Sequence, residues 1–388
     1  MKRRSLLIGA GALALGQGLT GCRASTTALR VQYLQNSMPV QLVQRFEQQL
    51  TSPINLDFIP IGQLATLFEQ LQQWHQTPIQ ATRTFWQPLP RSPQHPADLV
   101  TLGDYWLKPA IQQQLIQPLP LEQSQGWQRL APRWQQLVRR NPQGEPDLNG
   151  EIWAAPYRWG TLALVYQVEA FERLGWTPTQ WSDLNRPEVQ QQLSLPDDAR
   201  VVIGLALKQL GRSINTPTPP SSLAAQLRQL HQQVKFYSSD AYLQPLLLKD
   251  TWLAVGWSTD ILPVLESDRR FAAVIPSEGT VLTADLWVHP TGSSSTTNGL
   301  SPSTSIASEW IEFCWSEAAA LELSLLSAGL SPALTSASSQ LPTSLQANSL
   351  KRPEDTVLQQ SEFLQPLSRA ATERYQRLWS AIRQETAG

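Results

Sequence analysis

Residues 28–59, ALRVQYLQNSMPVQLVQRFEQQLTSPINLDFI, carry the pattern that decides the fold. The stretch 28–34 is typical of a β-strand, and the apolar residues after Pro39 recur near helical spacing as far as Leu50, which predicts a helix. Residues 54–59 predict a second strand, 64–74 an amphipathic helix and 97–102 a third strand. This β-α-β-α-β order predicts a parallel sheet with helices on both faces.

The same alternation continues through the rest of the chain, which has no internal repeats. We expect a strand pair at 152–157 and 162–166, helices at 171–174, 201–210 and 222–234, and strands at 251–257, 272–276 and 284–288. Residues 76–96 and 291–305 are expected to be loops, and 306–388 mostly helical with a Ser/Pro-rich break at 331–353.

Composition limits the number of domains and the class of partner. A chain of 388 residues exceeds what one hydrophobic core usually serves, so two lobes are expected. Charged residues make up 16% and the formal net charge is −1, which argues against nucleic acid as a partner. The 15 tryptophans are suited both to a core and to stacking on a ligand.

The N-terminus has the pattern of an export signal. The basic residues 2–4 precede an apolar stretch too short to span a bilayer, and the sequence Leu19-Thr20-Gly21-Cys22 resembles the lipobox of bacterial lipoproteins. We therefore predict a signal peptide at 1–22, lipidation of Cys22, and a mature protein anchored outside the cytoplasmic membrane. Ordinary cleavage with an incidental Cys22 is the alternative, and Arg3-Arg4 fits a twin-arginine signal or a generic basic region.

The remaining motif survey argues against an enzyme or a metalloprotein. Cys314, the second of two cysteines, is interpreted as a buried apolar residue. The four histidines stand in no nucleophile elbow and no metal-ligand spacing, and we find no P-loop or dinucleotide fingerprint, so no cofactor is expected.

A series of short motifs then resembles one family of proteins. In order along the chain they are Asp98-Leu99-Val100 with Tyr105, 155–161 (APYRWGT), 181–184 (WSDL), 196–200 (PDDAR), 256–258 (GWS), 276–279 (PSEG) and 285–288 (DLWV). Each is weak alone, but together, over residues 29–335, they resemble the extracellular solute-binding proteins of the spermidine/putrescine-binding type.

The resemblance implies an α/β fold of two lobes, the type II periplasmic-binding-protein fold, in which each lobe has a mixed, mostly parallel sheet flanked by helices. It implies a ligand cleft between the lobes and docking onto an ABC permease. We expect lobe 1 at 29–155, with 284–312 returning to it, and lobe 2 at 156–283. The C-terminal helices of 313–388 are expected to pack across both lobes.

The resemblance also assigns ligand contacts, because members of the family hold amines between carboxylates and aromatic walls. The matching positions are Tyr105, Asp198, Trp257 and Asp285, with Trp159 as a further wall. Other family contact positions are substituted here, namely Leu34, Ser37, Gly103, Val201 and Thr283, which argues against a long polyamine. Cation–π contacts from such walls are worth about 0.5–2 kcal/mol each.

Each of these residues also has a structural interpretation. Asp198 precedes a predicted helix and could be its N-cap, Trp257 and Trp159 could belong to the core, and Tyr105 could serve packing alone. Asp104 and Asp260 could face the cleft, but solvation in loops is the preferred interpretation.

The function expected from these observations is capture of a small cationic solute, such as a polyamine, by a monomeric lipoprotein that delivers it to a membrane importer. Three alternatives stay open. The same scaffold could bind an amino acid, a sugar, iron or an organic anion, with Arg158 or Arg200 facing the anion. The protein could bind partners and no small ligand, or, least favoured, it could be a hydrolase.

Overall fold

The computed structural model describes residues 29–51, 54–76, 96–292, 302–334 and 341–385. The predicted signal peptide and Cys22 lie outside these residues, as does most of the two expected loops at 76–96 and 291–305. Lipidation of Cys22 therefore stays a prediction.

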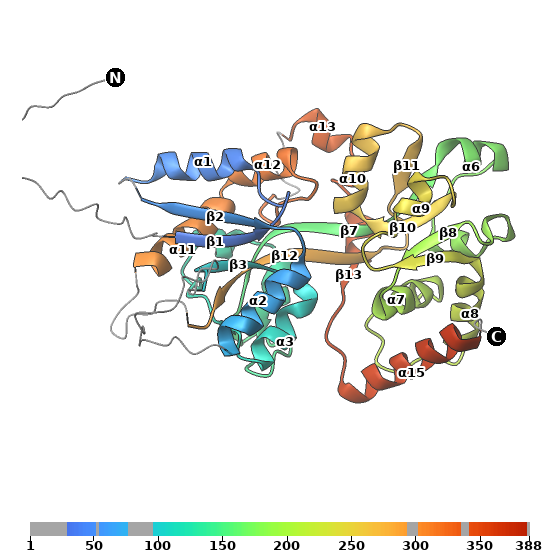
Figure 1. Ribbon diagram of the computed structural model, residues 1–388, viewed down its shortest axis with the longest axis horizontal. Helices are drawn as coiled ribbons and strands as arrows, with labels where there is room; N and C mark the ends of the chain where they lie inside the picture. The colour runs from blue at the N-terminus through green and yellow to red at the C-terminus, as the bar shows by residue number, and fades with distance from the viewer. Residues whose placement is uncertain (1–28, 52–53, 77–95, 293–301, 335–340, 386–388) are drawn as a thin grey trace, which may run out of the picture.

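The N-terminal pattern folds as predicted. Strand β1 (Leu29–Leu34) pairs in parallel with β2 (Leu56–Ile61) and with β3 (Leu99–Gly103). Helix α1 (Val40–Gln49) begins after Pro39, which is its N-cap residue, and lies on one side of these strands. Helix α2 (Leu64–Gln76) packs against β1 and β3 on the other side (Figure 1).

Two long antiparallel strands connect the halves of the molecule. Strand β12 (Val281–Pro290) pairs with β3 on one side and with β7 (Ala155–Gln167) on the other. The predicted strand pair at 152–157 and 162–166 is wrong, because 155–167 is one continuous strand and only β6 (Glu151–Ile152) precedes it. The backbone of β7 pairs with β12 along its first part and with second-half strands along its second part, so Pro156 and Gly160 do not interrupt it.

The second half is built on the far end of β7. Strands β10 (Leu253–Trp257) and β11 (Phe271–Val274) pair antiparallel with it, and β8 (Leu193–Pro196) and β9 (Val234–Ser238) extend the sheet in parallel from β10. Strands β8 and β9 were not predicted. Around them lie helices α6 (Val168–Leu174), α7 (Ala199–Gln209), α8 (Leu223–Gln233) and α10 (Ser258–Ser267).

The other elements are short, or follow β12, the second strand that connects the two halves. They are η1 (Asp104–Trp106), α3 (Leu107–Gln112), β4 (Ile116–Gln117), α4 (Gln125–Arg129), α5 (Pro132–Val138), β5 (Arg139–Arg140), η2 (Trp181–Asn185), η3 (Pro187–Val189), α9 (Gln244–Leu247), α11 (Pro302–Cys314), α12 (Glu317–Leu326), α13 (Thr343–Gln346), α14 (Asp355–Gln359), β13 (Glu362–Phe363) and α15 (Arg369–Glu385).

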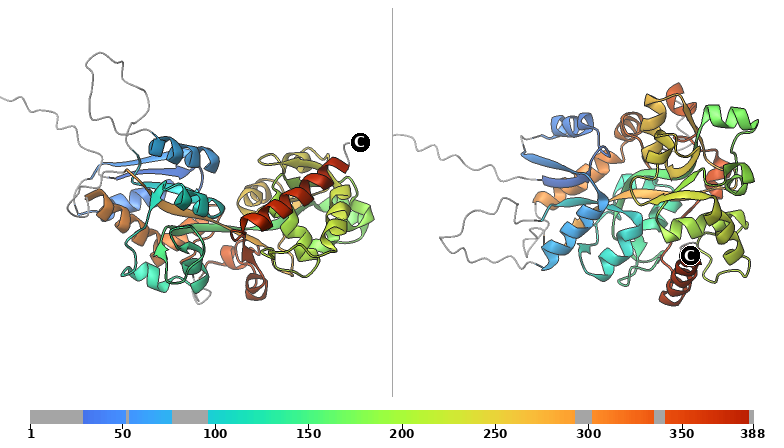
Figure 2. Two further views of the ribbon diagram at one scale, coloured as in Figure 1. Left: turned by 90° about the horizontal axis from the view of Figure 1, so that it is seen from below. Right: turned by 45° about the vertical axis from the view of Figure 1, so that its right-hand side comes forward.

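Each half has its own hydrophobic core, and Figure 2 shows the two halves joined by a narrow middle. In the second half, Leu162 and Leu164 of β7 join one cluster, and the alternate residues Ala163 and Val165 join another, so both faces of the sheet are covered. Cys314 is buried in the first core, as its sequence context predicts. We call the two halves the first and second lobes.

The end of the chain runs along the junction between the lobes. Strand β13 pairs in parallel with β12, and the chain then runs on to α15, which packs on α7 and α8 of the second lobe (Figure 1). Residues 361–368 are called the C-terminal crossing below. The residue boundaries expected for the lobes stay a prediction, because the lobes share β7, β12 and this crossing.

Candidate functional site

A cavity of about 740 Å³ lies beside β7, β12 and the C-terminal crossing, and residues of both lobes line it. We call it the cleft. All five residues expected to contact a ligand line the cleft: Tyr105, Trp159, Asp198, Trp257 and Asp285. Their contact with a ligand stays a prediction, but the fold brings together positions up to 180 residues apart in the sequence.

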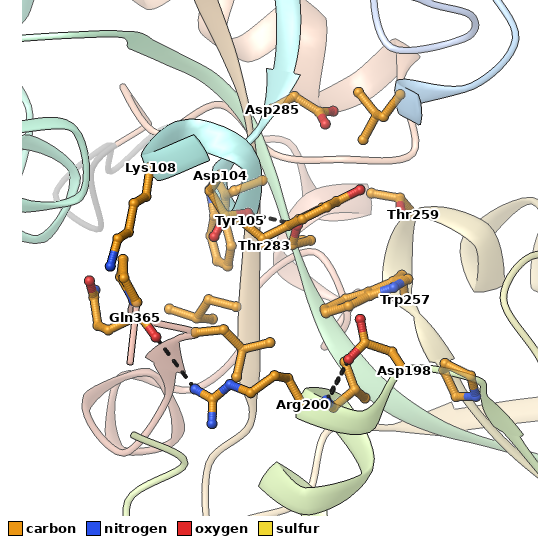
Figure 3. A pocket seen from close by; sticks show the side chains of 18 of the residues that line it. Asp104, Tyr105, Lys108, Asp198, Arg200, Trp257, Thr259, Thr283, Asp285 and Gln365 are labelled. Atoms are coloured by element: carbon orange, nitrogen blue, oxygen red, sulfur yellow. Dashed lines mark hydrogen bonds between the residues drawn. The ribbon is translucent and has the colours of Figure 1, made fainter. Parts of the chain in front are cut away.

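Two aromatic side chains enter the cleft from different lobes (Figure 3). Tyr105 follows β3 of the first lobe and is 49% exposed, whereas Trp257 ends β10 of the second lobe and is half-buried. Gly103 makes room for Tyr105, since a Cβ at this position would lie 2.8 Å from the tyrosine ring. The exposure of Tyr105 leaves its ring available to a solute.

Trp159 lies deeper. It is 8% exposed, packs against Trp134 with ring centroids 5.3 Å apart, and belongs to the first core. Its backbone exchanges two hydrogen bonds with Leu330. Trp159 is therefore chiefly a core residue with one edge on the cleft, as its structural interpretation predicts.

Asp198 is the N-cap of α7. Its carboxylate accepts hydrogen bonds from the backbone N–H groups of Arg200 and Val201, at 2.8 and 3.0 Å. This arrangement satisfies two of the unpaired donors at the start of a helix. The side chain is exposed at the cleft, so capping and contact with a solute are compatible.

Asp285 has a basic partner that the sequence motifs did not indicate. It lies opposite Arg158 in the β7–β12 pair, and Arg158 Nε donates to its carboxylate at 2.6 Å. Both side chains are almost fully buried. Burial alone would lower the pKa of Arg158, but the charge of Asp285 raises it, so Arg158 stays charged beside this carboxylate. Most of the negative charge of Asp285 is thus neutralised inside the protein.

Asp104, in contrast, is a buried carboxylate that accepts only neutral donors. It is 7% exposed, and it accepts from the backbone N–H of Ala284 at 2.9 Å and from Thr283 Oγ1 at 3.1 Å. Burial raises its pKa to about 7, although these hydrogen bonds oppose the shift. No basic side chain of the described residues lies within 4 Å of it. The expectation that Asp104 is solvated in a loop is wrong.

Asp260 is a second carboxylate without a basic partner among the described residues. It lies in the first turn of α10, lines the cleft, and accepts a hydrogen bond from the hydroxyl of Tyr242. The side chain is open to the cleft, yet the surrounding protein raises its pKa through desolvation. Its expected solvation in a loop is therefore corrected to a place on the wall of the cleft.

The substituted positions divide into two groups. Leu34, Val201 and Thr283 line the cleft, so these changes alter its surface, and Thr283 gains the role of a donor to Asp104. Ser37 lies in the first core instead, where its hydroxyl is 2.7 Å from that of Tyr157. By the family resemblance, Leu34, Ser37 and Thr283 stand where aromatic residues are expected, and Val201 stands where a carboxylate is expected.

Basic side chains occupy another part of the cleft. Lys108, Arg140 and Arg200 line it, and Lys108 is paired with Glu145 at 2.6 Å. Gln365, from the C-terminal crossing, lies beside Arg200 (Figure 3). Neither Arg140 nor Gln365 belongs to a motif of the sequence. The two residues meet because the C-terminal crossing places Gln365 beside Arg140.

The described residues contain no group of three or more His, Cys, Asp or Glu side chains arranged to hold a metal ion. Among the same residues no helix combines the length and the apolar character needed to cross a bilayer.

The known proteins that this chain resembles are solute-binding proteins. Residues 94–359 match a family model described as bacterial extracellular solute-binding protein. The spermidine/putrescine-binding periplasmic protein of Salmonella typhimurium is 28% identical over 190 residues, 48% of this chain and 52% of that protein. The putrescine/cadaverine-binding protein of Pseudomonas aeruginosa is 29% identical over 156 residues, 37% of this chain and 44% of that protein. The chain spans about half the length of the curated relatives it matches.

Solved structures extend the likeness to nearly the whole chain. The spermidine/putrescine ABC transporter substrate-binding protein PotD from Streptococcus pneumoniae aligns with a TM-score of 0.73 at 21% identity, covering 92% of this chain and 98% of that one. The Tp0655 (TpPotD) lipoprotein of Treponema pallidum aligns with a TM-score of 0.61 at 18% identity, covering 91% and 98%. The predicted two-lobed type II fold is confirmed.

Proposed function

The chain belongs to the bacterial extracellular solute-binding protein family, and from this premise we propose that it captures a small cationic solute, such as a polyamine, and delivers it to an ABC permease. The cleft between the lobes is the proposed binding site. The named relatives bind spermidine, putrescine or cadaverine, which supports a ligand with ammonium groups.

One observation carries the proposal. Asp104, Asp198 and Asp260 line one cleft, and no basic side chain of the described ranges forms an ion pair with any of them. A buried carboxylate without a counter-charge is costly, so a cation in the cleft would stabilise Asp104, and the exposed carboxylates of Asp198 and Asp260 would add to the attraction. The hydrogen bonds that these acids accept come from backbone N–H groups and hydroxyls, which carry no formal charge.

The aromatic walls complete the proposed site. An alkyl ammonium has a pKa near 10.4 and arrives charged. Tyr105 and Trp257 would cover its methylene groups, and their faces would attract the charge. Trp159 would add an edge deeper in the cleft, and Asp285 would act with its free oxygen, since Arg158 occupies the other.

In this proposal no bond is made or broken, so the protein is a carrier and not an enzyme. It acts as a monomer outside the cytoplasmic membrane, to which a lipid on Cys22 anchors it. Approach of the lobes around the solute would present a closed form to the permease.

A thermal-shift screen of the purified protein tests the ligand class. Putrescine, cadaverine and spermidine are compared with amino acids, sugars, dicarboxylates and metal salts. A solute present at one hundred times its Kd should stabilise the fold by about 2.7 kcal/mol, and we expect the amines to raise the Tm. A shift with sugars or dicarboxylates alone would contradict a cationic ligand.

The anchor is tested separately by labelling cells with a clickable fatty acid. The wild-type chain and the Cys314→Ser variant should carry the label, because Cys314 is buried in the core, and the Cys22→Ser variant should not. A label on the Cys22→Ser variant, or none on the wild type, would contradict the proposal.

A further inference from the structure

Two guanidinium groups lie at one edge of the cleft, and a simple diamine has no anionic group to pair with them. Arg140 comes from the first lobe and Arg200 from α7 of the second, and both contact Gln365 of the C-terminal crossing. Figure 3 shows Arg200 beside Gln365. Arg140 Nη1 donates to Gln365 Oε1 at 3.4 Å, and Arg200 Nη2 donates to the backbone oxygen of Gln365 at 3.4 Å. One neutral residue thus holds two guanidinium groups at the edge of the cavity. We call Arg140, Arg200 and Gln365 the basic corner.

Neither guanidinium forms an ion pair with a carboxylate among the described residues. Arg140 is 3% exposed, and its Nε and Nη2 donate to the backbone oxygen of Leu137 at 3.0 and 2.7 Å. Arg200 donates to the backbone oxygen of Ile214 and to Asn215 Oδ1, each at 3.3 Å. A buried cation with only neutral acceptors keeps an uncompensated charge, which an anion in the cleft would neutralise.

The other charges near the corner do not compensate it. Burial lowers the pKa of Arg140 to about 10, and it outweighs the opposing influence of Asp104 and Glu145. Burial also lowers the pKa of Arg200, against the influence of Tyr375 and Asp198. By comparison, Arg158 of the same cleft has a carboxylate at 2.6 Å.

We infer that the solute carries an anionic group, such as a carboxylate, as well as an ammonium group, and that the basic corner holds the anionic end. This inference rests on the proposed function and narrows its ligand class to zwitterions with separated charges. Guanidinium groups suit the task, because each offers several donors in a planar fork that matches a carboxylate. The cleft of about 740 Å³ has room for both ends.

The position of Gln365 adds to the argument. The family match ends at residue 359, so the residue that holds both guanidiniums lies beyond the part of the chain that matches the family model. The ligand preference of relatives therefore does not have to extend to this corner.

Titration calorimetry with three probes of one length tests the inference. Cadaverine has two amines, 5-aminopentanoate has one amine and one carboxylate, and glutarate has two carboxylates. With the wild-type protein we expect 5-aminopentanoate to bind about tenfold more tightly than cadaverine, the scale of one charge-assisted interaction.

Two variants at the corner should remove this preference. Arg200→Gln deletes one cation, and Gln365→Glu places an internal carboxylate between both, so that each should weaken 5-aminopentanoate about tenfold while cadaverine binds as well or better. Gln365→Glu adds favourable pairs and should fold even if Arg200→Gln does not. Arg270→Gln, at an exposed arginine paired with Asp268 outside the cleft, is the control and should change neither affinity.

The outcomes separate the two proposals. If cadaverine binds more tightly than 5-aminopentanoate, or if neither corner variant changes the affinity for the zwitterion, the inference is overturned and the cationic carrier stands. If glutarate binds most tightly, or if no probe binds, both proposals fall.

Discussion

The pKa of Asp104 makes capture of a cation dependent on pH. A cation gains from Asp104 only when the carboxylate is ionised, and burial raises the pKa of this group to about 7. Binding should therefore displace a proton, and the affinity should rise as the pH increases through 7. The amines of a polyamine stay charged over this range, because their pKa lies near 10.4.

The size of the effect follows from the ionised fraction. With a pKa of about 7, roughly one-eleventh of Asp104 is ionised at pH 6 and roughly ten-elevenths at pH 8, so the affinity should increase about tenfold between these values. At pH 7 about half a proton should be released for each cation bound. Asp260, whose pKa is also raised, adds a contribution in the same direction.

Calorimetry with putrescine at pH 6, 7 and 8, in buffers of different ionisation enthalpy, measures both quantities. Asp104→Asn keeps an acceptor for Ala284 and Thr283 but cannot ionise, so it should lower the affinity at pH 8 about tenfold and flatten the profile near pH 7. Asp250→Asn, at an exposed position outside the cleft, is the control. An affinity that does not change from pH 6 to 8, or an unaltered profile in Asp104→Asn, would refute the reasoning.

Three further predictions concern the walls and the buried pair. Asp285→Asn leaves Arg158 buried without a counter-charge and should reduce the free energy of unfolding in urea by about 3–5 kcal/mol, whereas an unchanged midpoint would show that the pair contributes little. Gly103→Ser places a Cβ against the ring of Tyr105 and should shift this side chain in a crystal structure; an unmoved ring would contradict the close contact. Trp257→Ala should weaken a bound amine by about 0.5–2 kcal/mol, and unchanged calorimetric affinity would remove this residue from the wall.

Local sequence patterns were sufficient for the first lobe. Each strand and helix between residues 29 and 103 has the expected period, and the parallel order of β1, β2 and β3 follows from the alternation. The short strands β8 and β9 were missed because LSLP and VKFYS lack a clear alternating pattern. The strand pair predicted at 152–157 and 162–166 is replaced by the single strand β7, because pairing with neighbouring strands keeps it continuous.

The candidate site was predictable in its aromatic and acidic positions and not in its charge balance. Family motifs indicated Tyr105, Asp198, Trp257 and Asp285, which all line the cleft. The partner of Asp285 lies 127 residues away in sequence, and no local pattern reports a contact of that separation.

The same limit applies to the acids without basic partners and to the basic corner. Whether Asp104 is solvated or buried depends on β12, which supplies its two donors. Arg140 meets Gln365 only because the end of the chain, 225 residues later, runs along the junction between the lobes.

A crystal structure of the protein with the tightest-binding solute of the screen would locate the guest directly. We expect an ammonium nitrogen about 3 Å from a carboxylate oxygen of Asp104 or Asp260, with the aliphatic chain between Tyr105 and Trp257. A solute bound outside the cleft, or one whose amine meets none of its acids, would contradict capture of a cation between the lobes.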